Sequence, residues 1–329
     1  MYKDTRKKIY EELGEEVSGE ALHIAFKDKG EKQVRKENWL KNDSETAILI
    51  REIGGNGFYF KCYKNVLELD IPKQYLFRYT YLCTYLDYDG KLKIMVNGKK
   101  KAITERDLQE ILKLSEREAR NTKNELIKYG LIIINEDGTI SINSKYAIKG
   151  EVKRKKLRGC ARIMINGIRE IYEKSKPIEH KRLALLIQLL PYVNYNYNII
   201  CFNPDEEDKD KIIPMGVKDL CKITDYNERN WRKLKNELLR ITVGGTPVIA
   251  VTEIYNGHAV SINPKIYYKG NNPRALEWLA VLFNILGKKY RRGNNPLFFI
   301  CTFCADTMLC MYIFVPFFLM IFALKWLYH

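Results

Sequence analysis

The spacing of apolar residues along the 329-residue chain predicts helices in some stretches and strands in others. Four segments have the spacing of helices: 71–88, 163–173, 181–193 and 273–286. Pro72 suits the first turn of the first of these. In residues 46–62, apolar and polar residues alternate on either side of a Gly-Gly-Asn-Gly sequence, which predicts a β-hairpin. Residues 91–96 predict a short strand. Residues 1–45 are mostly charged and predict an arm of low stability.

One stretch of the chain occurs twice. Residues 107–126 and 219–238 both begin Asp-Leu and both contain Glu-Arg-x-x-Arg-x-x-Lys-Asn-Glu-Leu, 112 positions apart and without a gap. A matching Ser-Ile-Asn segment follows each copy, in residues 140–150 and 260–270, now 120 positions apart. Identity at this level indicates an internal duplication.

Each copy predicts two helices followed by a hairpin. Ser115 and Glu118 fit a capping box at the start of the second helix, and Thr104 is expected to cap the first. An Asp-Gly or Asn-Gly turn between two apolar runs then predicts a hairpin. Helix, turn, helix and hairpin together describe a winged helix. The sequence therefore predicts a mainly α, α+β fold with two tandem winged-helix domains, small β-hairpin wings and an apolar C-terminal helix.

The second helix of each copy has an apolar face and a basic face. Ala119, Thr122 and Leu126 are expected to point inward in the first copy, and Trp231 stands where Ala119 does in the second. The outward residues are Arg117, Arg120, Asn121 and Asn124 in copy one and Arg229, Arg232, Lys233 and Asn236 in copy two. Arg can bind guanine bidentately, Asn can bind adenine in the same way, and Lys suits phosphates. These faces predict contact with DNA, and a merely solvated polar face is the alternative.

The overall charge agrees with a polyanionic partner. The chain carries 56 Lys and Arg against 40 Asp and Glu, a formal charge of +16. Such a surplus favours nucleic acid or an anionic membrane surface and does not choose between them. Eight cysteines in a chain of this size do not predict a disulfide framework. Cys62, Cys83, Cys160, Cys201 and Cys221 are scattered and predict reduced core thiols and a cytoplasmic compartment.

The pattern divides the chain into six parts. They are a charged arm and hairpin (1–68), winged helix one (69–150), a basic linker and connecting helix (151–176), winged helix two (177–271), an amphipathic helix (272–292) and an apolar segment (296–328). The linker is either attracted to phosphates or merely solvated. The acidic insertion 205–210 is expected to be a solvated loop.

The C-terminal segment differs from the rest in composition. Residues 308–324 contain no charge, and a Lys- and Arg-rich cluster at 288–292 precedes them. This predicts a transmembrane helix for 296–328 that holds the DNA-binding domains at the cytoplasmic side of a membrane. An out-of-frame or foreign extension is the equal alternative.

Sequence motifs for catalysis are missing. The chain contains no Gly-x-Ser-x-Gly, Walker or dinucleotide-binding sequence, and its four histidines are not paired at helical metal-binding spacing. We therefore expect no enzyme activity, no cofactor and no metal ion.

The repeat resembles the tandem winged-helix replication initiator proteins of Gram-positive plasmids and phages. The resemblance covers about residues 70–270 and includes an ending of the form Asn-Pro-x-x-x-x-x-Gly, here Asn263 to Gly270 and, with Ser144 in place of Pro, Asn143 to Gly150. It implies that the second helix of each unit lies in the major groove, with the wings along the backbone. The expected function is recognition of origin DNA, with the replication machinery as a further partner. The alternative is a transcriptional regulator held at the membrane by its tail. The oligomeric state is open.

Overall fold

The computed structural model describes residues 31–291, except 32, 35–36, 38–40, 42–43, 54, 56, 151, 153–158, 225 and 255–256; the side chains of 254, 257 and 284–291 are also not described. The expected transmembrane segment 296–328 and most of the N-terminal arm lie outside the described residues. Within the described part, every helix is too short or too polar to cross a bilayer.

The fold is α+β, with helices and small antiparallel sheets, as predicted. The first copy comprises β1 (Phe58–Lys61), α3 (Tyr63–Leu67), α4 (Lys73–Leu82), β2 (Lys93–Val96), β3 (Lys99–Ala102), α5 (Leu108–Leu112), α6 (Glu116–Lys128), β4 (Ile132–Ile134), β5 (Ile140–Ile142) and β6 (Ala147–Ile148). The second comprises β7 (Ala161–Met164), α8 (Ile165–Lys174), α9 (His180–Leu183), α10 (Leu185–Gln188), α11 (Val217–Ile223), α12 (Trp231–Arg240), β8 (Thr242–Val243), β9 (Thr246–Pro247), β10 (Ile249–Ile254), β11 (Gly257–Ile262) and β12 (Tyr267–Tyr268). Helix α13 (Pro273–Arg291) follows. Each copy thus contains the two helices and the hairpin that the repeat predicts.

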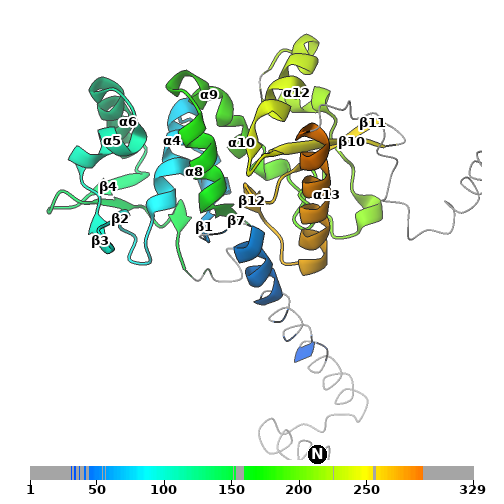
Figure 1. Cartoon of the computed structure of the whole chain (residues 1–329), viewed down its shortest axis with the longest axis horizontal. Helices are drawn as coiled ribbons and strands as arrows, with labels where there is room; N and C mark the ends of the chain where they lie inside the picture. Colours follow the sequence, from blue (N-terminus) through cyan, green and yellow to red (C-terminus); the bar gives the residue numbers. More distant parts are fainter. Residues whose placement is uncertain are drawn as a thin grey trace, which may run out of the picture.

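A four-stranded antiparallel sheet joins the two copies at the centre of the molecule (Figure 1). Its strand order is β12-β7-β1-β6, so each copy contributes one inner and one outer strand. In the outer pairs, Lys61 lies opposite Ala147 and Ile163 lies opposite Tyr267. Since Ala147 and Tyr267 are 120 positions apart, like the matching end segments of the repeat, Lys61 and Ile163 are counterparts.

The register of the inner pair reveals an internal two-fold axis. Counting back one residue from Lys61 and Ile163 makes Phe60 and Arg162 counterparts, and these two residues lie opposite each other in the β1–β7 ladder. A residue paired with its own counterpart in an antiparallel ladder must lie on the axis that exchanges the copies. The duplication is therefore arranged as a pseudo-symmetric dimer within one chain.

The same backbone hydrogen bonds recur in both copies. The Asn143 side-chain amide donates to the Gly130 carbonyl at 2.9 Å, and the Asn263 side chain donates to the Pro247 carbonyl at the same distance. The backbone carbonyl of each asparagine also accepts a hydrogen bond from the backbone N–H three residues later, again at 2.9 Å. The two Ser-Ile-Asn segments are therefore structural equivalents as well as sequence repeats.

The copies also share one hydrophobic core. Helix α4 packs against α9 across the axis. The rings of Tyr81 on α4 and Tyr172 on α8 stack in parallel with their centroids 3.7 Å apart. Aromatic side chains such as these bury large areas, so separating the copies would expose much of the core.

The hairpin predicted for residues 46–62 is wrong. Residues 44–53 are helical, and β1 belongs to the central sheet. Thr46 and Ile50 are buried, which follows a helical spacing that the short alternating run concealed. Ile50 packs with Leu276 and Leu279 of α13, so α13 packs within the chain.

The basic linker is also shorter than predicted. The segment assigned to a linker and connecting helix, 151–176, contains β7 and α8, which are the first strand and helix of the second copy. Arg162 is buried in β7 and donates to the Gly270 carbonyl at 2.5 Å, so it is not available to a phosphate. The five cysteines in the described part are buried, and the sulfur atoms of Cys62 and Cys160 lie 3.0 Å apart.

Candidate nucleic-acid interface

Helix α6 begins at the predicted cap and buries the predicted face. The Ser115 hydroxyl accepts from the Glu118 N–H at 3.3 Å. The reciprocal half of the expected capping box is absent, because the Glu118 carboxylate faces Arg78 at 3.5 Å instead. Ala119, Thr122 and Leu126 are buried against the core, which fixes the opposite face toward solvent.

The predicted outward residues of α6 are all exposed. Arg117, Arg120, Asn121 and Asn124 lie on one side of the helix, free of the core. Glu116 is exposed in the first turn as well, so one carboxylate accompanies the basic side chains at the start of the helix. Glu116 lies at the helix N-terminus, where a negative charge is favourable to the helix itself.

Helix α12 presents the matching face in the second copy. Arg232, Lys233 and Asn236 are exposed, and Arg229 is exposed in the 3₁₀ turn Glu228–Asn230 that precedes the helix. The Asn227 side-chain oxygen accepts from the Arg229 N–H at 2.9 Å and so takes the place of the Ser115 cap. The predicted inward position of Trp231 is only partly right: its side chain is half-buried at the edge of the core.

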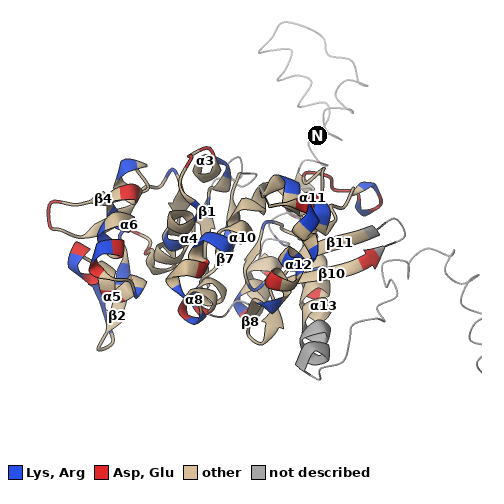
Figure 2. Cartoon of the chain, turned by 90° about the horizontal axis from the view of Figure 1, so that it is seen from above, with Lys and Arg blue, Asp and Glu red and all other residues tan. Residues whose placement is uncertain are grey.

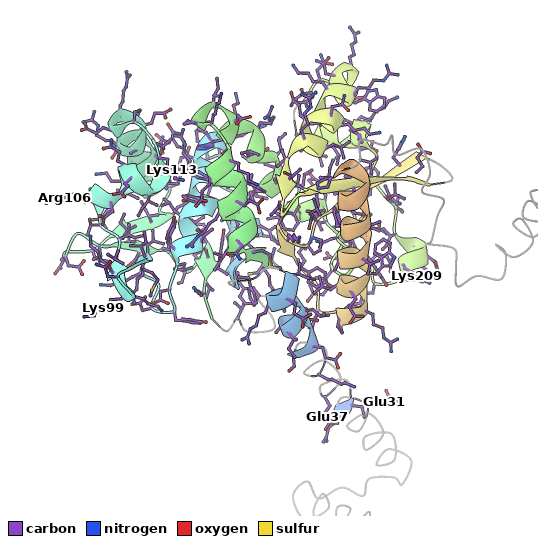
Figure 3. All side chains as sticks on the ribbon, in the orientation of Figure 1. Glu31, Glu37, Lys99, Arg106, Lys113 and Lys209 are labelled. Carbon is purple, nitrogen blue, oxygen red and sulfur yellow. The ribbon has the colours of Figure 1, made fainter. Side chains whose placement is uncertain are left out.

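Both helices lie along one edge of the molecule. Figure 1 shows α6 and α12 at the same edge, on either side of α9, and the side chains of both helices project from it (Figure 3). In the view from above, Lys and Arg are present on both helices (Figure 2). The pseudo-two-fold axis between β1 and β7 accounts for this placement, because it carries one helix onto the position of the other.

Arg78 anchors α6 to the second copy. Its guanidinium is buried and donates to the Thr122 hydroxyl on α6 at 3.0 Å and to Nδ1 of His180 on α9 at 3.2 Å. Burial, together with the neighbouring Arg78 charge, lowers the pKa of His180 to about 4. His180 is therefore neutral at pH 7 and accepts the Arg78 hydrogen bond. A lone arginine within the apolar α4 was the only sequence signal for this contact.

Each pair of repeat helices, α5–α6 and α11–α12, is held by a side chain from the other copy. The Lys73 ammonium of copy one donates to the Thr224 carbonyl, at the end of α11, at 3.2 Å. The Tyr172 hydroxyl of copy two donates to the Leu112 carbonyl, just before α6, at 2.8 Å. Leu112 and Thr224 are counterparts, 112 positions apart. These reciprocal bonds fix the two outward faces relative to each other.

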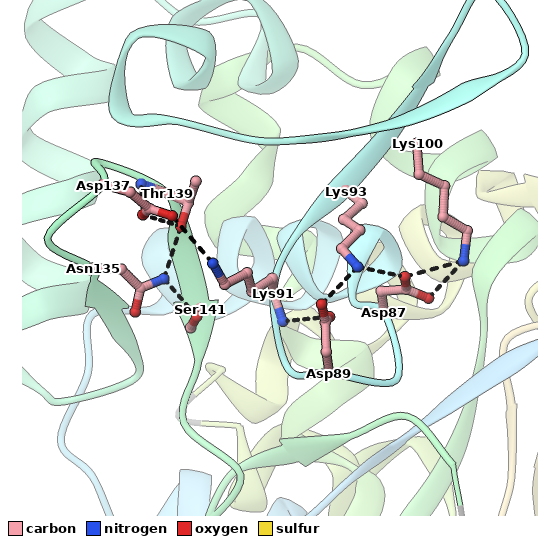
Figure 4. Close-up of polar contacts among 9 residues, drawn as sticks. All are labelled: Asp87, Asp89, Lys91, Lys93, Lys100, Asn135, Asp137, Thr139 and Ser141. Atoms are coloured by element: carbon pink, nitrogen blue, oxygen red, sulfur yellow. Dashed lines mark hydrogen bonds and ion pairs between the residues drawn. The ribbon is translucent and has the colours of Figure 1, made fainter.

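The β4–β5 hairpin of copy one has an acidic tip. Glu136 and Asp137 are exposed in the turn between β4 and β5. Hydrogen bonds from the Thr139 hydroxyl and N–H, with the Lys91 ammonium 3.2 Å away, lower the pKa of Asp137 to about 2 (Figure 4). A permanently charged carboxylate at the tip repels phosphate. This hairpin is therefore less suited to contact a DNA backbone than the resemblance implies.

No family model, curated protein or solved structure matches the chain. Among the described residues, no group of three or more His, Cys, Asp and Glu side chains is arranged to hold a metal ion.

Proposed function

We propose that the chain is a sequence-specific double-stranded DNA-binding protein with two winged-helix readers, α6 and α12. The observation that carries the proposal is the pair of exposed Arg- and Asn-bearing faces on counterpart helices at one edge of the molecule. Side chains of these types recognise guanine, adenine and phosphate. The contacts across the two-fold axis support two readers that approach one duplex together.

The two-fold axis gives the target an expected form. Helices related by such an axis read opposite strands, so the site should be an imperfect inverted repeat with half-sites about one helical turn, ~34 Å, apart. Arg117 matches Arg229, Arg120 matches Arg232 and Asn124 matches Asn236. Asn121 is replaced by Lys233, and there the half-sites should differ.

A selection experiment tests the proposal. The full-length chain is incubated with a random duplex library, bound sequences are amplified, and the affinity for the selected site is measured over a range of salt concentrations. We expect one enriched site with inverted half-sites and an affinity that falls steeply as salt rises, because Lys and Arg displace counterions from phosphates. Absence of enrichment, or a flat salt response, would contradict DNA binding.

The biological role is proposed as initiation of plasmid or phage replication. Its rival is transcriptional regulation by the same two readers. The selected site distinguishes them: copies beside a replication origin support the initiator, and a site that overlaps a promoter supports the regulator. Plasmid maintenance that depends on an intact gene for this chain would support initiation directly.

A further inference from the structure

One segment differs between the two copies, although it begins and ends at equivalent hydrogen-bonded positions in both. In copy one the Ile103 N–H donates to the Leu92 carbonyl, and in copy two the Met215 N–H donates to the Ile200 carbonyl, both at 2.8 Å. The chain between these positions forms the β2–β3 hairpin in copy one and a loop, residues 202–213, in copy two. The hairpin and the loop are therefore structural counterparts with unrelated sequences.

The hairpin is basic and has an apolar tip. Residues 93–102 contain four lysines and no carboxylate. Lys99, Lys100 and Lys101 are exposed on β3, while Met95 and Val96 on β2 are 60% and 44% exposed. Lys100 is held 2.9 Å from Asp87, and Lys93 lies 3.0 Å from the same carboxylate (Figure 4). These ion pairs at the base of the hairpin leave Lys99 directed to solvent at its tip.

The counterpart loop is acidic and also carries exposed apolar side chains. Residues 202–213 contain five carboxylates and two lysines. Phe202 and Ile213 flank the loop and are each 57% exposed. The loop also contains a shallow hollow lined by Asn203, Pro204, Asp205, Glu206 and Glu207. The Phe202 N–H donates to the Ile213 carbonyl at 3.0 Å, so these two exposed apolar side chains belong to neighbouring residues.

The two surfaces lie at opposite ends of the molecule. Figure 3 shows Lys99 at one end and Lys209, within the loop, at the other. They cannot meet within one chain, yet their charges are opposite. Both surfaces carry exposed apolar side chains, with lysines around them on the hairpin and mainly carboxylates around them on the loop. Opposite charge around an apolar centre is the arrangement that favours specific docking.

We propose that the β2–β3 hairpin of one chain docks on the 202–213 loop of a second copy. Because the two surfaces differ, the contact is heterologous and joins copies head to tail. Each joined copy still has a free hairpin or a free loop, so association can continue beyond two chains. Both surfaces lie away from the edge that carries α6 and α12, so docking through them leaves that edge uncovered (Figures 1 and 3). The proposal goes beyond DNA recognition and does not depend on it.

Charge reversal at the tip tests the contact. The full-length chain is compared with Lys99→Glu, Glu207→Lys and the double variant by sedimentation velocity at low salt, without DNA. Lys181→Glu on α9 is the control, because it makes the same charge change at an exposed position near the middle of the molecule. We expect each single reversal to weaken association about tenfold, the double variant to recover most of that loss, and the control to behave like the wild type.

A zero-length carbodiimide crosslink gives a second readout. Chains labelled with ¹⁴N and ¹⁵N are mixed, treated and digested, and we expect mixed-isotope peptides that link a hairpin lysine to a loop carboxylate. A monomeric wild type, association unaffected by the single reversals, a double variant as weak as the singles, or only same-isotope links would each overturn the proposal. Association through the C-terminal segment alone would give the second of these results.

Discussion

Phe60 and Arg162 lie opposite each other in the β1–β7 ladder, and each is the other's counterpart in the duplicated sequence. The Arg162 guanidinium lies 5.5 Å from the centre of the Phe60 ring, within the range of a cation–π contact. The duplication makes these two positions equivalent, and they now hold a complementary pair of side chains on the axis. A symmetric pair of arginines there would place two charges together in a buried site.

Both proposed DNA-reading helices belong to one chain, so each can be changed by mutation without changing the other. Arg117→Ala and Arg229→Ala remove equivalent exposed side chains from α6 and α12. Each should weaken binding to the selected site by ~1–3 kcal/mol and relax the preference at one base position in its own half-site. Binding measured against a panel of single-base variants checks this. Lys145→Ala, an exposed lysine in the turn after β5, should leave base preference unchanged.

A swap at the one unmatched position extends the test. Asn121→Lys gives α6 the four outward residues of α12, so the selected site should become more symmetric. A site preference that does not change with Asn121→Lys, Arg117→Ala or Arg229→Ala would show that these helices do not read bases.

We expect the buried Lys61 side chain to lower the free energy of unfolding, because its counterpart Ile163 has no charge to bury and Lys61 does. Its ammonium is fully buried and bonded to the Thr80 hydroxyl at 2.5 Å, and burial lowers the pKa of Lys61 to about 8. Lys61→Met should raise the free energy of unfolding at pH 7 by ~1–3 kcal/mol, because an apolar side chain of similar length avoids burying a charge. Thr80 keeps its bond to the Leu76 carbonyl.

The pH dependence distinguishes the charge from simple packing. Between about pH 8 and the ordinary lysine value of 10.5, the unfolded chain binds a proton at Lys61 that the native state has lost. The wild type should therefore gain stability over this range, and the advantage of Lys61→Met should shrink. Chemical denaturation at pH 7, 8 and 9 measures it, with Lys64→Met on the exposed face of α3 as the control. A Lys61→Met protein less stable than the wild type at pH 7 would contradict the account.

Local patterns predicted the parts of the fold that local contacts decide. The apolar stripes of α6 and α12 can be predicted because a helix repeats every 3.6 residues. The hairpins can be predicted because their two strands are neighbours in sequence. The pairing of β1 with β7 joins residues about a hundred positions apart, and no short pattern reveals it. The same is true of Lys73 with Thr224, whose contact depends on how the copies pack. Residues 44–53 were misread because a short apolar run fits both periods.

Trp231 is expected to contribute less to stability than its size suggests. Its side chain is half-buried at the edge of the core, and the Arg232 guanidinium lies 5.4 Å from the ring centre. Trp231→Ala should lower the free energy of unfolding by about 1–3 kcal/mol, below the range typical of a fully buried Trp. Thermal unfolding measures the loss. A change in DNA affinity with no loss of melting temperature would instead assign Trp231 to the binding surface.

His180 should make the contact between the copies sensitive to acid. Its ring is buried beside Arg78 on α4, Phe77 on α4 and Tyr172 on α8, and the Glu179 carboxylate acts on its pKa in the opposite direction to Arg78. Burial beside Arg78 lowers the pKa of His180 from 6.5 to about 4. Between these values the unfolded chain binds a proton that the native state does not, so stability falls as pH falls from 6.5 toward 4. One proton corresponds to a slope of up to about 1.4 kcal/mol per pH unit.

The variant His180→Gln removes the titration and keeps an acceptor for Arg78. Its melting temperature should fall less than that of the wild type between pH 7 and pH 4.5, whatever the substitution costs at pH 7. The slope is the informative quantity, because packing defects shift both ends of the curve equally. His258→Gln, in β11 and away from the axis, is the control and should follow the wild type. Parallel curves for His180→Gln and the wild type would mean that the acid sensitivity of the fold arises elsewhere, and that Arg78 does not depend on a neutral His180 to hold α6 against the second copy.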